Sequence, residues 1–214
     1  ICGFNTGTIE KCINEADVSV SSSGGSDVGG ICGYNSGTIE KCINSVSINS
    51  NGVVGGICGT NTKLTRYCYN TGDMIGQGSL IGGICGSDTG MGTNSNSVEY
   101  CYSTGRISTA SKSYDVYVGG IIGSGSKAVN CYYNKDHGNI GGIQGSDISG
   151  MAEGKTMEEL CGDLASLGFD ETVWAKGTAG PLTVTSGNNA IKECTLPSLI
   201  LGIGIAFVGM YRSR

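Results

Sequence analysis

The chain has 214 residues, of which 39 are glycine, 2 are proline and 11 are cysteine, and its formal net charge is −5. Hydrophobic residues make up 38% of the chain and charged residues 14%, which excludes the charge-rich, proline-rich composition of a disordered protein. The 13 basic residues are scattered along the chain, so the composition also argues against a nucleic-acid-binding surface.

A short repeat covers residues 1–150. Its clearest copy is GGICGYNSGTIEKC at residues 29–42, and the spacing between copies from residue 29 onward is 26, 27, 37 and 22 residues. Units this short cannot bury a core alone and are stable only when neighbouring units stack. The copies begin at Ile1, Gly29, Gly55, Gly82, Gly119 and Gly141.

Within each copy, aliphatic residues occur in short runs separated by Gly-Gly, Asn-Ser-Gly or Thr-Gly. Short β-branched runs between such turn sequences indicate strands, because glycine and asparagine adopt positive φ at little cost. The sequence therefore predicts an all-β fold, a parallel β-solenoid (β-helix) of about five to six coils, with one coil for each repeat.

One polar row recurs at the first turn of the repeat. Stacked coils would bring its members into register, and we expect these side chains to bond the turn backbone of the next coil. A carbohydrate-binding role for the same row is the alternative. The row consists of Asn5, Asn35, Asn61, Asp88 and Asp147, and Gly125 interrupts it.

The repeat pattern GG-x-x-G-x-N-x-G-x-I-x-x-C, followed by Tyr/Ile-Asn and Thr-Gly, resembles the GLUG repeat. That repeat is found in large bacterial surface and secreted proteins, including adhesin-like and immunoglobulin A peptidase-type proteins. The resemblance covers residues 1–150 and implies a β-solenoid outside the cell. The chain departs from the family pattern where cysteine replaces an aliphatic residue of the GG-x-x-G box.

The cysteines occur at two repeating positions, ten to sixteen residues apart. This spacing does not match a zinc knuckle. Two interpretations remain: disulfides within each coil, which the sequence favours, and a ladder of buried free thiols. Cys131 supports the ladder, since Ile122 stands where its partner would be. The predicted pairs are Cys2/Cys12, Cys32/Cys42, Cys58/Cys68 and Cys85/Cys101.

Residues 151–187 differ from the repeats and are predicted to form a helix-plus-strand cap. Thr156 and Glu159 have the spacing of a capping box. Leu160 and Leu164 share one face of the helix that follows, until Gly168 ends it. We expect Phe169 and Trp174 to cover apolar edges of the last coil, rather than Trp174 to serve as a sugar-stacking platform.

After a linker at residues 188–195, residues 196–214 form an apolar tail that ends in Arg212 and Arg214. Positive charge after an apolar run is typical of a membrane anchor, although the run is shorter than the about 20 residues that span a bilayer. Leu196-Pro197 resembles the start of a sortase signal, but Leu199 and Ile200 depart from it. A terminal core strand is the other interpretation.

The sequence predicts neither a catalytic site nor a metal site. Glu10, Glu40 and Glu99 recur at one position, each beside Lys or Tyr, which indicates a solvated face. His137 lies in a turn-rich stretch without a nucleophile nearby. No calcium nonapeptide is present, and no cofactor is implied.

The predicted function is that of a non-catalytic structural or adhesion protein at the cell surface. Its repeats would form a stalk that presents a binding surface. The expected partners are a surface protein or glycan of a host or neighbouring cell, and a membrane or cell wall bound through the tail. The alternative is a carbohydrate-active β-helix enzyme of the polysaccharide lyase or hydrolase type.

Overall fold

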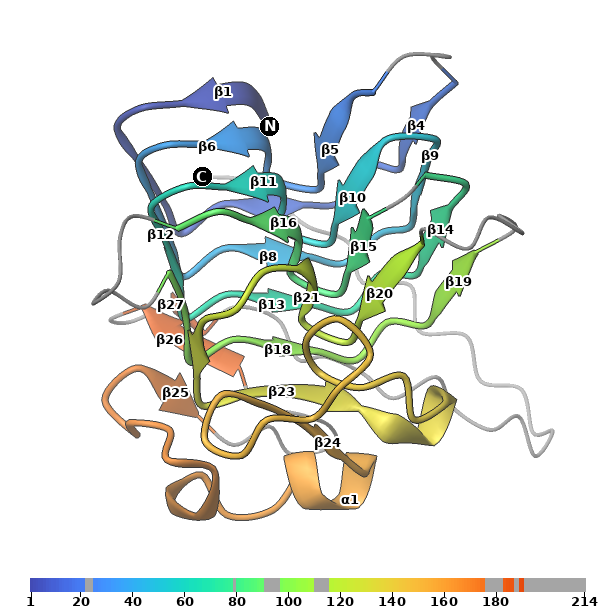
Figure 1. The fold of residues 1–214 in the computed structure, drawn as a ribbon. Coiled ribbons are helices and arrows are strands. Elements are labelled where there is room, and N and C mark those ends of the chain that lie inside the picture. Colours follow the sequence, from blue (N-terminus) through green and yellow to red (C-terminus); the bar gives the residue numbers. More distant parts are fainter. Residues whose placement is uncertain are drawn as a thin grey trace, which may run out of the picture.

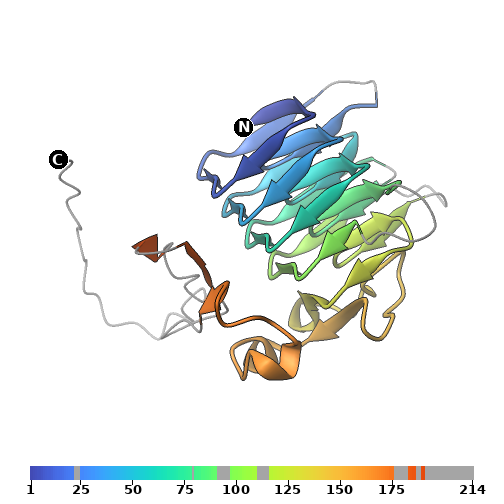
Figure 2. The ribbon, with the colours of Figure 1, turned by 90° about the vertical axis from the view of Figure 1, so that its left-hand side faces the viewer.

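A computed structural model describes residues 1–21, 25–78, 80–90, 97–109, 116–175, 183–186 and 189–190 of the chain. The chain winds into a parallel β-solenoid, with the first coil at one end and the short helix α1 at the other (Figure 1). Seen from the side, the coils stack as successive parallel layers (Figure 2). The predicted fold class is confirmed.

Each complete coil contributes one strand to each of five parallel sheets, which we name A to E. Sheet A contains β1 (Cys2–Asn5), β6 (Cys32–Asn35), β11 (Cys58–Asn61), β16 (Cys85–Asp88) and β21 (Ile122–Ser124). Sheet B contains β2 (Thr8–Glu10), β7 (Thr38–Glu40), β12 (Leu64–Arg66), β17 (Val98–Glu99) and β22 (Ala128–Val129).

The other three sheets complete the coil. Sheet C contains β3 (Ile13–Asn14), β8 (Ile43–Asn44), β13 (Tyr69–Asn70), β18 (Tyr102–Ser103), β23 (Cys131–Asn134) and β24 (Ala152–Lys155). Sheet D contains β4 (Val18–Val20), β9 (Ile48–Ser50), β14 (Met74–Gly76) and β19 (Ile107–Thr109). Sheet E contains β5 (Asp27–Gly29), β10 (Val53–Gly55), β15 (Leu80–Gly82) and β20 (Tyr117–Gly119).

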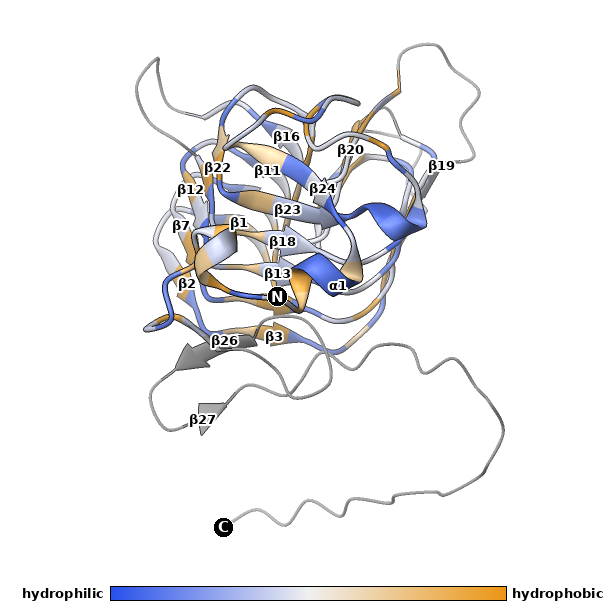
Figure 3. Cartoon of the chain, turned by 90° about the horizontal axis from the view of Figure 1, so that it is seen from below, coloured by the Kyte–Doolittle hydropathy of each residue, from blue (hydrophilic) through white to orange (hydrophobic). Residues whose placement is uncertain are grey.

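The strand register follows the sequence repeat. Cys2 pairs with Cys32, and Asn5 pairs with Asn35, in the first two strands of sheet A. Viewed along the axis, successive coils lie over one another (Figure 3). Equivalent residues of successive coils therefore form columns parallel to the solenoid axis.

The interior holds two apolar clusters. One lies between sheets A, B and C and contains aliphatic residues together with all seven buried cysteines of the described residues. The other lies between sheets D and E and contains Val28, Ile48, Val54, Met74 and Ile81. Because each coil supplies only a few of these side chains, burial depends on the coils above and below.

The Gly-Gly pairs of the repeat are explained by close packing across the interior. A Cβ atom at Gly56 would collide with the side chain of Asn70, and one at Gly83 would collide with Ser103. Any side chain at the second glycine of the pair would therefore push sheet C away. This position requires glycine because there is no space for a Cβ atom. Its backbone conformation does not require glycine, since its φ is not in the left-handed region.

The solenoid has four complete turns and part of a fifth, fewer than the five to six coils expected. The copy that begins at Gly141 does not form a coil. Ile143 pairs with Ile122, one residue out of the register that the sequence alignment predicts. The chain then reverses, as the antiparallel bridge from Ile143 to Ser146 shows, and Gln144 and Gly145 both have positive φ.

The cap contains two short helical elements instead of the single helix that the sequence predicts. Thr156 and Glu159 form the predicted capping box, but α1 extends only over Met157–Leu160. A 3₁₀ turn, η2 (Ala165–Leu167), follows and ends at Gly168 in the left-handed conformation. The Asp163 side chain accepts a hydrogen bond from the Ala165 N–H, which provides a local alternative to a continuous helix.

The aromatic residues of the cap cover the outer face of sheet C rather than the end of the last coil. Trp174 contacts Tyr69 and Tyr102, with ring centroids 6.3 and 5.4 Å apart. Phe169 contacts Tyr132 and stacks on Trp174. The end of sheet C is covered instead by β24, which extends that sheet by one parallel strand, and α1 packs beside β23 and β24.

The remaining described elements are η1 (Lys135–His137) and an antiparallel sheet of β25 (Trp174–Ala175), β26 (Thr183–Ser186) and β27 (Asn189–Ala190). The predicted tail at residues 196–214 lies outside the described residues, as does most of the linker at 188–195. No helix among the described residues has the length and apolar character needed to cross a membrane.

Candidate functional site

The most ordered chemical feature of the molecule is a set of side-chain columns that run from coil to coil. The first is the polar row at the turn between sheets A and B. Asn5 Nδ2 donates to Asn35 Oδ1 at 2.7 Å, and Asn35 Nδ2 donates to Asn61 Oδ1 at 2.8 Å. Each amide also bonds backbone, as Asn35 does to the Leu64 carbonyl and the Gly37 N–H.

Asp88 ends this column. It accepts a hydrogen bond from Asn61 Nδ2 at 2.9 Å and a short one from the Ser97 hydroxyl. A carboxylate only accepts, so the donor-to-acceptor chain of amides stops there. Burial raises the pKa of Asp88, and the hydrogen bonds from Ser97 and Asn61 offset this only in part.

Asp147 does not join the column. The register shift at Ile143 removes it from the row, and its side chain is exposed and accepts a hydrogen bond from the Gly142 N–H. The predicted row therefore consists of four residues in the structure: Asn5, Asn35, Asn61 and Asp88.

A second amide column lies on the inner face of sheet C and was not predicted as a site. Asn14 Nδ2 donates to Asn44 Oδ1 at 2.9 Å, and Asn44 Nδ2 donates to Asn70 Oδ1 at 2.7 Å. Ser103 ends this column by accepting from Asn70 Nδ2. The signal in the sequence was the Asn that follows Ile or Tyr after the second cysteine of three successive repeats.

Between sheets B and C the chain turns through a row of residues in the left-handed conformation. Their φ values lie between 46 and 56°, although none is glycine. L-residues avoid this conformation, at a cost of about 1–2 kcal/mol each, unless the surroundings stabilise it. The row consists of Lys11, Lys41, Tyr67, Tyr100 and Asn130.

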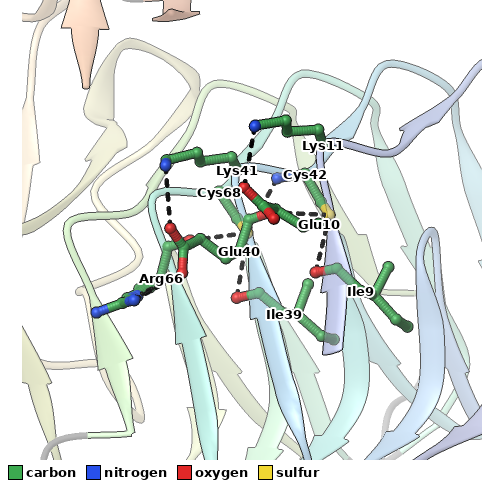
Figure 4. Close-up of polar contacts among 9 residues, drawn as sticks. All are labelled: Ile9, Glu10, Lys11, Ile39, Glu40, Lys41, Cys42, Arg66 and Cys68. Carbon is green, nitrogen blue, oxygen red and sulfur yellow. Dashed lines mark hydrogen bonds and ion pairs between the residues drawn. The ribbon is translucent and has the colours of Figure 1, made fainter. Parts of the chain in front are cut away.

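The cysteine that follows each of these residues stabilises the corner by hydrogen bonding. The Cys42 N–H donates to Cys68 Sγ, and the Cys68 N–H donates to Cys101 Sγ, both at 3.4 Å. The Cys42 thiol in turn donates to the Glu40 carbonyl at 3.3 Å (Figure 4). This corner column thus uses sulfur both as donor and as acceptor, and Cys131 continues it by accepting from the Cys101 N–H.

The other cysteine column lies in sheet A and has a different role. Its sulfurs bond few groups outside the column, as in the contact from Cys32 Sγ to the Tyr34 carbonyl at 3.1 Å. Burial, assisted by the neighbouring Cys58, raises the pKa of Cys32 to about 12. Ile122 takes the next place below Cys85, so an aliphatic residue fits this column. The column consists of Cys2, Cys32, Cys58 and Cys85.

The prediction of within-coil disulfides is wrong, because the ten cysteines of the described residues are all free thiols. The two cysteines of each predicted pair belong to different columns, the first to sheet A and the second to the corner before sheet C. The pairs that are absent are Cys2/Cys12, Cys32/Cys42, Cys58/Cys68 and Cys85/Cys101.

The first coil shows this separation. Cys2 pairs with Cys32 in sheet A, whereas Cys12 is the first member of the corner column, and its thiol donates to the Glu10 carbonyl at 3.5 Å. The nearest partners lie along the axis instead, as with Cys58 and Cys85, whose sulfurs are 3.3 Å apart. The structure thus has the arrangement of the alternative, a ladder of free thiols that is buried except at the first coil.

The predicted acidic row is interrupted by a base. Arg66 lies in register between Glu40 and Glu99, and its guanidinium Nη2 is 2.7 Å from Glu40 Oε2. Lys41 Nζ is 3.1 Å from the other oxygen of Glu40 (Figure 4). Burial raises the pKa of Glu40, but the hydrogen bonds from Arg66 and Lys41 outweigh it and hold this pKa below its usual value.

His137 lies at the end of η1 on the exposed surface. Within the described ranges, no group of three or more His, Cys, Asp or Glu side chains is arranged to hold a metal ion. Comparisons of the chain with protein-family models, curated proteins and solved structures found no match. The GLUG resemblance therefore stays a prediction.

Proposed function

We propose that the chain is a non-catalytic structural or adhesion protein of the cell surface. In this role the solenoid acts as a stalk that holds a binding surface away from the envelope. The observation that carries the proposal is the continuity of the columns: the same hydrogen bond recurs from Asn5 through Asn35 and Asn61 to Asp88. A repeated axial bond favours length and stiffness rather than one specialised coil.

The alternative is a polysaccharide-degrading β-helix enzyme. A glycosidase needs two carboxyl groups facing one sugar, one of which has a raised pKa so that it acts as an acid near neutral pH. Glu40 faces Arg66 and Lys41 instead, and its pKa is lowered. Asp88 has a raised pKa, but it is buried at the end of an amide column and bonds Asn61 and Ser97. These partners support a structural role for both carboxyl groups.

The proposed partners are a protein or glycan on a host or neighbouring cell, and a membrane or cell wall bound through residues 196–214. Burial of the apolar tail in the lipid would hold the chain at the membrane, and Arg212 and Arg214 would remain on the cytoplasmic side. The GLUG resemblance supports this extracellular placement.

Fractionation of cells that express the intact chain, or a chain ending at residue 195, tests the placement. We expect the intact chain in the envelope fraction, accessible to protease added outside, and the shortened chain in the medium. Release of both forms into the medium, when each is fused to the same secretion signal, would overturn anchoring through the tail.

A further inference from the structure

Cys58 and Cys85 form a contact that the cysteine columns alone do not require. They pair in register on the neighbouring strands β11 and β16, and their sulfurs lie 3.3 Å apart in the interior. Neighbouring residues of paired strands have Cα atoms about 4.8 Å apart, which is inside the range of about 4.4–6.8 Å found for disulfides. The Cβ atoms of in-register parallel strands repeat at the same spacing and must approach to about 3.5–4.5 Å, so a bridge along the axis needs side-chain rotation and a small approach of the two strands.

The contacts of the neighbouring residues favour this pair over the pair of Cys58 with Cys32. The Cys32 thiol, above Cys58, is directed to the Tyr34 carbonyl. Ile122, below Cys85, offers no sulfur. Cys85 thus has a single cysteine neighbour within its column, and this neighbour, Cys58, is the sulfur with which it would form a disulfide.

We infer that Cys58 and Cys85 form an oxidation site, at which a peroxide joins the third and fourth coils through an inter-coil disulfide. In the first step one sulfur attacks a peroxide oxygen, the O–O bond breaks, and a sulfenic acid and one water form. In the second step the other sulfur displaces hydroxide from the sulfenic sulfur. Both thiol protons leave in water, so two thiols and one hydrogen peroxide give one disulfide and two waters.

Oxidation would link two successive coils covalently along the solenoid axis. A bridge between residues 27 apart lowers the conformational entropy of the unfolded chain and so raises the stability of the folded state. Both thiols are buried, and burial raises the pKa of Cys85. The reaction therefore depends on a small neutral oxidant and is slower than that of an exposed thiol.

Peptide mapping of the full chain tests the inference. The reduced protein is treated with hydrogen peroxide, its remaining thiols are blocked, and it is digested with pepsin at acid pH so that disulfides do not exchange. We expect a cross-linked peptide pair containing Cys58 and Cys85, lighter by two hydrogens than the reduced pair. The oxidised chain should melt roughly 10 °C higher than the reduced chain.

Cys85→Val should abolish both the cross-link and the rise in melting temperature, whereas the control Cys2→Val, in the first coil of the same column, should keep both. The wild-type map alone decides the pairing if Cys85→Val does not fold. A bridge from Cys58 to Cys32 or Cys68, or from Cys85 to Cys101 or Cys131, would overturn the inference. So would recovery of Cys58 and Cys85 as blocked thiols after the oxidant has modified the half-exposed Cys2.

Discussion

Asn35 Nδ2 donates a hydrogen bond to Asn61 Oδ1 at 2.8 Å, although 26 residues separate the two along the chain. The same bond occurs between Asn5 and Asn35, and an equivalent one joins Asn61 to Asp88. Each amide is fully used only when coils lie both above and below it. This relationship makes the inner coils more sensitive to substitution than the first coil.

Asn35→Leu should destabilise the protein by about 3 kcal/mol, because it leaves the Gly37 N–H and the Asn61 side chain without their buried partner. The control is Asn5→Leu, which has a partner on one side only and should cost about 1 kcal/mol. Urea unfolding monitored by circular dichroism measures both. Equal costs at the two positions would contradict cooperative stacking along the column.

The two cysteine columns should respond differently to valine. Cys68→Val removes the acceptor of the Cys42 N–H and should cost about 2 kcal/mol. Cys85→Val removes a sulfur from a column that already contains Ile122, and should cost less than about 1 kcal/mol. Chemical denaturation under reducing conditions gives both values. A larger loss of stability for Cys85→Val than for Cys68→Val would show that the cysteines stabilise the fold by packing and not through the corner hydrogen bond.

Asp88→Asn should change the pH dependence of stability. Because the folded-state pKa of Asp88 is raised, its favourable contribution is complete below the usual Asp range and is lost as the pH rises through the raised pKa. The unfolding free energy of the wild type, relative to Asp88→Asn, should therefore fall as the pH rises above about 4, the usual pKa of Asp. Denaturation at a series of pH values measures this difference. A difference that is constant with pH would mean that the Asp88 pKa is not raised.

Trp174→Ala should cost about 3–4 kcal/mol, since the side chain is fully buried against Tyr69 and Tyr102. The control, Val173→Ala, lies next to it but is only partly buried, and it should cost about 1 kcal/mol. Thermal unfolding compares the two, and the exposure of Tyr69 and Tyr102 is followed by tyrosine fluorescence. A cap that detaches without change in the melting of the coils would show that the outer face of sheet C is stable by itself.

The sequence repeat was sufficient to predict the solenoid and the row from Asn5 to Asp88. Stacking puts equivalent residues in register, so a period in sequence becomes a column in space. The end of the array was not predictable in this way. The Gly141 copy retains the letters of the motif, but it pairs one residue out of register and reverses direction, and Asp147 leaves the row.

The within-coil cysteine pairs do not form because the axial spacing of the coils, and not closeness in sequence, decides which sulfurs meet. Cys32 and Cys42 belong to one coil, yet they point into different columns, where each meets the equivalent cysteine of the next coil. The corner hydrogen bonds depend on the left-handed φ of Lys41 and its equivalents, which no residue type at that position reveals. The place of the cap on sheet C likewise depends on contacts of Trp174 that periodicity does not encode.

Incubation of the purified protein with a panel of acidic and neutral polysaccharides tests the proposal that the chain is a non-catalytic surface stalk. The measured quantities are new reducing ends and the unsaturated products of lyase action. A non-catalytic stalk should give neither product, at any pH, from the wild type or from Glu40→Ala. Cleavage by the wild type that disappears in a folded Glu40→Ala variant would contradict it.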